Sequence, residues 1–124
     1  MTVQQKPDSK TITQQARARG AFSHVLDGRA LGDKLSTLDA IAAALSFPDY
    51  FGRNLDALYD CLTDLSWLPA GEHVLIWIAS DVLRRADPKS YLAVHSVLSD
   101  AQRALAPGGE RADSRTLTVV LTDD

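Results

Sequence analysis

The chain has 124 residues, of which 45% are hydrophobic and 23% are charged, so length and composition predict one globular domain with a modest core. No uninterrupted apolar run approaches the roughly 18 residues that a membrane-spanning helix requires, and the first 20 residues are polar, so we expect no membrane association and a cytoplasmic location. The single cysteine, Cys61, cannot form an internal disulfide or a zinc cluster, which agrees with a reducing compartment.

The formal net charge of −3 is concentrated in one segment of the chain. Residues 54–83 contain five acidic residues and no lysine or arginine, so this segment carries −5 and the rest of the chain sums to +2. A local negative field attracts basic partners and repels nucleic acid. We therefore expect a basic protein partner and no nucleic-acid binding.

The first part of the chain is polar, and apolar periodicity begins only after it. Residues 1–20 show almost no apolar periodicity, which predicts a flexible N-terminal extension followed by one domain over residues 21–124. Within this domain the segment AFSHVLD (21–27) alternates partly between apolar and polar residues and predicts a short strand. Ser36 is a candidate cap for a helix over residues 37–45.

The rest of the chain alternates predicted helices and strands. Asn54 is a good N-cap for a helix, the apolar run HVLIWIA predicts a strand covered on both faces, and Asp87 followed by Pro88 is typical of a helix start. The remaining expected elements are the strand at 73–79, a short helical turn at 81–86, a helix over 88–105 and a strand at 115–122. Strands separated by helices predict an α/β fold with a parallel sheet and right-handed crossovers.

The helix after Asn54 has an apolar side and an acidic side. At 100° per residue its leucines fall on one side and three aspartates, Asp56, Asp60 and Asp64, fall on the other. The helix dipole favours Asp56 but not Asp60 or Asp64, and each like-charge pair four residues apart costs roughly 0.2–0.5 kcal/mol. A total penalty of about 1 kcal/mol is small, so a merely solvated acidic face stays open on charge pattern alone.

The string LSFPDYFGRNLDALYDCLTDL, residues 45–65, resembles the signature of the barstar family of ribonuclease inhibitors. The family core reads Pro-acid-Tyr-aromatic-Gly-x-Asn-Leu-Asp-Ala-Leu-aromatic-Asp-x-Leu-Thr, and nearly every position matches. The order of the predicted elements also fits, so the resemblance covers about residues 21–122. It implies a two-layer α/β fold in which a three-stranded parallel sheet is packed with about four helices.

The resemblance also implies a function and a set of contact residues. Family members block a basic, secreted, guanyl-preferring ribonuclease of the barnase type by filling its active site. Asp60 would take the place of the scissile RNA phosphate, Asp56 would make a second contact, and Tyr50 would pack over the catalytic histidine of the enzyme. Tyr59 and Asp100 match further contact positions, and Gly52 and Asn54 would shape the binding loop. These matches give the partner-binding residues Tyr50, Asn54, Asp56, Tyr59, Asp60 and Asp100.

Four positions depart from the family pattern. Arg53 stands where an acid is common and adds positive charge to the binding loop, and Leu65 replaces an aromatic residue. Tyr59 replaces the usual tryptophan, and Asp100 is one methylene shorter than the usual glutamate. These departures bear on the choice of ribonuclease more than on the fold.

Three functions compete. The first is a catalytically inert, bacterial, cytoplasmic immunity protein that needs no cofactor or metal and is a monomer when free. The second keeps the fold but directs the acidic face to a different basic toxin or partner. The third is a hydrolase that uses Asp56, Asp60 and Asp64 as a metal or acid/base cluster, although carboxylates on one exposed helix face converge poorly on an ion and no histidine joins them.

Overall fold

Strand β2 (Gly71–Ile78) is the centre of the sheet, because a parallel strand pairs with each of its edges. The computed structural model describes residues 8–105 and 114–124. Strand β1 (Phe22–Asp27) lies on one side of β2 and strand β3 (Arg115–Leu121) on the other. The predicted three-stranded parallel sheet is confirmed, and each predicted strand lies within two residues of its observed limits.

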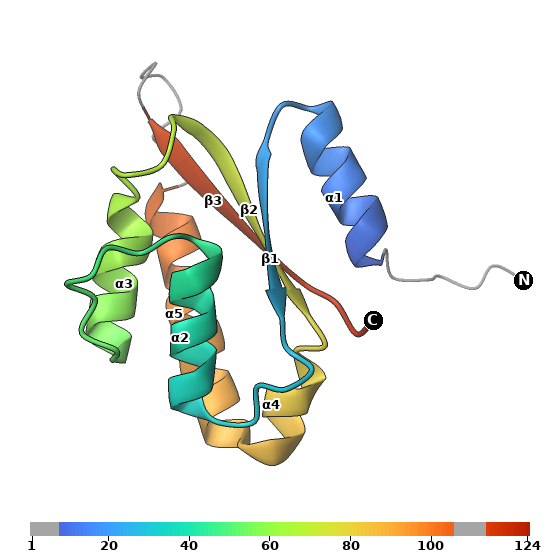
Figure 1. Cartoon of the computed structure of the whole chain (residues 1–124), viewed down its shortest axis with the longest axis vertical. Helices are drawn as coiled ribbons and strands as arrows, with labels where there is room; N and C mark the ends of the chain where they lie inside the picture. Colours follow the sequence, from blue (N-terminus) through green and yellow to red (C-terminus); the bar gives the residue numbers. More distant parts are fainter. Residues whose placement is uncertain (1–7, 106–113) are drawn as a thin grey trace, which may run out of the picture.

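Helices α2 (Lys34–Ala44), α3 (Leu55–Asp64) and α5 (Pro88–Leu105) cover one face of the sheet, and α4 (Asp81–Ala86) follows the end of β2 (Figure 1). The core on this face contains fully buried side chains from the sheet and from these helices. They include Leu75 and Trp77 of β2, Leu38 and Ile41 of α2, Leu58 and Leu62 of α3, and Leu98 of α5. Within the described residues, no helix is both long and apolar enough to cross a membrane.

Side-chain caps determine where these helices begin. Asn54 caps α3 as predicted, since its Oδ1 accepts a hydrogen bond from the Ala57 N–H at 2.8 Å. The prediction for α2 was wrong: Asp33, not Ser36, is the cap, and its carboxylate accepts from the Ser36 N–H at 2.8 Å. Helix α2 therefore begins at Lys34, three residues before the predicted start, because an aspartate satisfies the free N–H groups of the first turn as well as a serine does.

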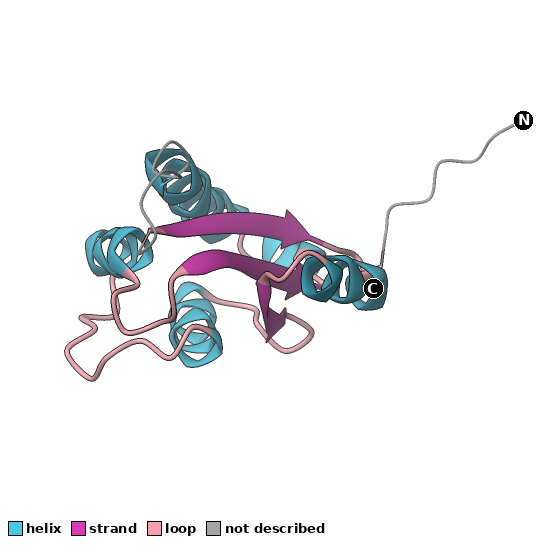
Figure 2. Cartoon of the chain, turned by 90° about the horizontal axis from the view of Figure 1, so that it is seen from above, coloured by secondary structure: helices cyan, strands magenta, loops and turns pink. Residues whose placement is uncertain are grey.

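Helix α1 (Ser9–Ala18) corrects the prediction of a flexible extension over residues 1–20. Asp8 caps the helix, and Ile12 and Ala16, one turn apart, are buried against the second face of the sheet. Two apolar residues make too weak a period to be recognised in a polar sequence, which is why the helix was missed. Residues 1–7 lie outside the described part of the chain. Helix α1 thus adds a layer to the two that were expected (Figure 2).

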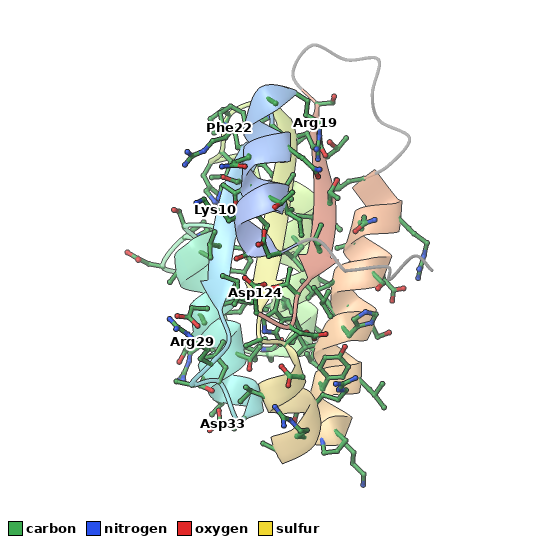
Figure 3. The ribbon with its side chains drawn as sticks, turned by 90° about the vertical axis from the view of Figure 1, so that its right-hand side faces the viewer. Lys10, Arg19, Phe22, Arg29, Asp33 and Asp124 are labelled. Atoms are coloured by element: carbon green, nitrogen blue, oxygen red, sulfur yellow. The ribbon has the colours of Figure 1, made fainter. Side chains whose placement is uncertain are left out.

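Polar contacts hold both ends of α1 to the domain. They involve Arg19 and Asp124, which lie near opposite ends of the helix (Figure 3). At the start of the helix, the Ser9 hydroxyl donates to the Asp124 carboxylate at 2.7 Å. Near its end, Arg19 makes two hydrogen bonds of 2.9 Å to Glu72 on β2. Exposed polar contacts add little to stability. The position of α1 therefore depends mainly on the burial of Ile12 and Ala16, although these two residues make only a small apolar interface.

Two histidines that are far apart in the sequence meet between β1 and β2. His24 Nε2 lies 2.9 Å from His73 Nδ1, and His73 Nε2 lies 2.8 Å from the Pro69 carbonyl oxygen. Because a carbonyl can only accept, His73 donates to Pro69 and its Nδ1 accepts from His24. Burial, and secondly the neighbouring His73, lower the pKa of His24. This hydrogen bond therefore requires a proton on His24 Nε2 and none on His73 Nδ1.

We predict that Ile12→Asp detaches α1 from the sheet and lowers the free energy of unfolding by about 2 kcal/mol or more, because a carboxylate cannot be buried against the apolar strands. Denaturant titration, together with hydrogen exchange of the α1 amides, measures the effect. Gln14→Asp is the matched control, since Gln14 is exposed on the same helix. Equal loss of stability in the two variants would contradict the role given to Ile12.

We also predict that the free energy of unfolding decreases when the pH is lowered through the range where His24 titrates. Its folded-state pKa lies below the ordinary value of 6.5, so the unfolded chain binds the proton first. The contribution to stability is therefore complete above that ordinary value and is lost as the pH falls through the folded-state pKa. His24→Gln keeps a donor for His73 and should reduce this loss. Urea titrations at about pH 7.5 and about pH 5.5 measure it, with His95→Gln as control; an unchanged pH dependence in His24→Gln would refute the assignment.

Candidate acidic binding surface

Helix α3 presents its acids outward because its apolar residues are fixed in the core. Leu58 and Leu62 are fully buried, whereas Asp56 and Asp60 are exposed. The helix ends at Asp64, and its C-cap, Leu65, is also fully buried and adopts the left-handed conformation at φ 50°. The outward position predicted for the acids is therefore confirmed, and the direction of each side chain follows from the burial of the leucines.

Neither Asp56 nor Asp60 forms an ion pair within the described ranges 8–105 and 114–124. Both line a hollow of about 610 Å³ at the start of α3. Asn54, Leu55 and Ala57 line the same hollow, and Lys34 at the start of α2 completes it. The hollow thus brings together three of the predicted site residues, Asn54, Asp56 and Asp60, with a lysine that the sequence analysis did not single out.

The loop before α3 is held from both sides. Phe47 and Phe51 pack against the main core, with their ring centroids 5.0 Å apart in an edge-on arrangement. Asn54 Nδ2 donates to the Gly52 carbonyl oxygen at 3.2 Å. Tyr50, which lies between these anchors, is 72% exposed and does not line the hollow. The loop therefore presents the Tyr50 ring to solvent from a braced backbone.

Arg53 does not add an uncompensated positive charge to this loop. Its guanidinium makes two hydrogen bonds, of 2.8 and 2.9 Å, to the carboxylate of Asp39 on α2. The same contact holds the pKa of Asp39 below its usual range. Asp39 takes no part in capping α2, because Asp33 provides the cap and Asp39 faces Arg53.

The other two predicted residues do not line the hollow. Tyr59 is on α3 and is 38% exposed. Asp100 is exposed on α5, the helix that packs against α3, and it forms an ion pair with Arg103 one turn later. Asp100 therefore reaches the surface as predicted, but part of its charge is neutralised within its own helix.

Cys61 belongs to the inner side of α3. Its side chain is 4% exposed, and burial raises the pKa of its thiol. Cys61 therefore packs as a small buried hydrophobic residue. Among residues 8–105 and 114–124, no group of three or more histidine, cysteine, aspartate or glutamate side chains is placed to hold a metal ion.

A three-stranded parallel sheet with an outward acidic helix after an aromatic loop is the arrangement expected for the barstar family, and comparison with known families agrees. The family described as "Barstar (barnase inhibitor)" matches residues 21–122. Because this match covers most of the chain, the protein belongs to the barstar family.

One relative is a protein of Bacillus subtilis (strain 168) that carries the name "Putative ribonuclease inhibitor YrdF". It is 49% identical to this chain over 45 residues, which are 36% of this chain and 50% of that protein. The chain thus spans about half the length of this curated relative.

Proposed function

We propose that this protein inhibits a basic, secreted, guanyl-preferring ribonuclease by inserting its acidic helix and loop into the active site of the enzyme. The observation that carries the proposal is the pair Asp56 and Asp60, which are exposed, lie one turn apart and have no ion-pair partner in the described part of the chain. Membership of the barstar family supports the same role.

In this proposal Asp60 acts as a substitute for an RNA phosphate. Its carboxylate would meet the arginines and the catalytic histidine of the enzyme through charge-assisted hydrogen bonds, which are about twice as strong as neutral ones. Asp56 would make a second contact of the same kind from one turn earlier. Because α3 is fixed by buried leucines, the acids are in place before the enzyme arrives, and little conformational entropy is lost on binding.

The residues around the hollow would provide the rest of the interface. Tyr50 precedes both acids in the sequence and Tyr59 lies between them. Both are exposed aromatic side chains, which are enriched in protein interfaces. Asp100 would reach a further basic group from α5, after giving up its contact with Arg103. Asn54 would act indirectly, since its side chain fixes both the loop and the start of α3.

The biological role that follows is immunity. A bacterium that secretes a ribonuclease needs an inhibitor in its own cytoplasm, and a monomeric acidic protein would serve this purpose. A second candidate is a different basic toxin bound by the same surface. The pairing of Asp100 with Arg103 favours this alternative, because it reduces the acidity of the α5 side of the surface.

We predict that Asp60→Ala weakens binding to the cognate ribonuclease by about 2–5 kcal/mol, because it leaves buried cations of the enzyme unpaired. Isothermal titration calorimetry with an inactivated ribonuclease measures the change, and an RNA cleavage assay measures the loss of inhibition. Asp64→Ala is the matched control, since it removes the same charge from the same helix outside the hollow. Similar affinities for the Asp60 variant and the unaltered protein would exclude the phosphate-substitute role.

We further predict that the association rate falls steeply with added salt, whereas the dissociation rate changes much less. Long-range attraction between the acidic surface and a basic enzyme is screened by ions, but contacts in the desolvated interface are screened weakly. Stopped-flow fluorescence at several salt concentrations measures both rates. An association rate that does not depend on salt would rule out electrostatic steering.

A further inference from the structure

Three cations lie beside the acidic surface, and they differ in their partners. Arg53 is bound to Asp39 through two hydrogen bonds, and Arg103 is paired with Asp100. Lys34 lines the hollow together with Asp56 and Asp60, and it forms no ion pair with any residue in the described segments. An approaching protein therefore meets two unpaired carboxylates and one unpaired ammonium group in the same hollow.

The stability of the fold gives little reason for a lysine at this position. Lys34 is the first residue of α2, where the positive end of the helix dipole disfavours a cation by about 0.3–1 kcal/mol. It interacts over a distance with Asp87, the cap of α5, but the Asp87 carboxylate is already satisfied by the Ser90 hydroxyl at 2.6 Å and the Ser90 N–H at 3.2 Å. The position of Lys34 is thus better explained by what enters the hollow.

We propose that Lys34 is a specificity-determining residue of the acidic surface. This inference rests on the proposed function and adds one property of the partner. The cognate ribonuclease presents a carboxylate next to the cations that Asp56 and Asp60 contact. A partner whose contact surface is cationic throughout places a like charge against Lys34 and is disfavoured. Discrimination between similar proteins commonly depends on such a repulsive element in addition to attractive contacts.

The chemistry of the hollow supports a contact between Lys34 and a carboxylate of the partner. Asp56 and Asp60 are separated by one helical turn, so they can accept hydrogen bonds from one arginine or from two neighbouring cations. Lys34 is a compact charge on a flexible stem with three donors, which can reach a carboxylate on the partner without a fixed geometry. A cation and an acid side by side on the enzyme would therefore complement the three charged groups of the hollow.

The test compares Lys34→Gln with Lys10→Gln, which removes the same charge from α1 on the opposite face of the sheet (Figures 1 and 3). Affinities are measured by titration calorimetry against a panel of secreted basic bacterial ribonucleases, each inactivated by substitution. We expect Lys34→Gln to weaken binding to the tightest partner by about 3–10-fold and to strengthen binding to the weakest by a similar factor, so that their ratio falls about tenfold or more. Lys10→Gln should change all affinities by one small common factor.

Each other outcome has a definite meaning. If Lys34→Gln also shifts every affinity by one common factor, Lys34 contributes only to net charge and the inference is wrong. If it strengthens binding to every ribonuclease, including the tightest, no partner acid faces Lys34 and the inference is again wrong. In both cases a loss of binding in Asp60→Ala would leave the inhibitor function intact. If the unaltered protein binds no ribonuclease, the proposed function and this inference fail together.

Discussion

The burial of Leu58 and Leu62 is the interaction on which the acidic surface depends. Each fully buried leucine contributes about 1.5–3 kcal/mol, whereas each repulsive pair of aspartates on α3 costs only about 0.2–0.5 kcal/mol. The apolar contacts therefore outweigh the repulsion between Asp56 and Asp60 and keep both side chains exposed. The helix cannot rotate to relieve this repulsion without exposing its leucines to water, so Asp56 and Asp60 are held in exposed positions.

Hydrogen bonds define the edges of the same surface. The Asn54 cap fixes the start of α3, and the Arg53 contact with Asp39 ties the loop to α2. Exposed ion pairs of this kind add at most about 1 kcal/mol to stability. The main effects of the Arg53 contact are therefore to fix the position of the loop and to compensate the charge of the guanidinium. This contact compensates the charge of Arg53, whereas Lys34 lines the hollow and forms no ion pair with any residue of the part of the chain that the structure describes.

Most of the fold could be predicted from local patterns, because the strands and helices after residue 20 have clear periods and caps. Helix α1 could not, since its burial depends on two residues, Ile12 and Ala16, in an otherwise polar segment. The contact between His24 and His73 and the position of Lys34 depend on strand register and helix packing, for which the linear sequence contains no signal. The exposure of the acids followed from the leucine pattern, whereas the binding roles of all six predicted residues stay predictions: Tyr50, Asn54, Asp56, Tyr59, Asp60 and Asp100.

The alternation of side chains along β2 has an evolutionary consequence. Leu75 and Trp77 belong to the core beneath α3, and Val74 and Ile76 belong to the core beneath α1. In the part of the chain that the structure describes, the sheet separates the two cores, so a substitution on the surface of α3 has little means of disturbing the packing of α1. The exposed face of α3 can therefore change without disturbing the core beneath α1, while the strand between the two cores is constrained on both of its faces.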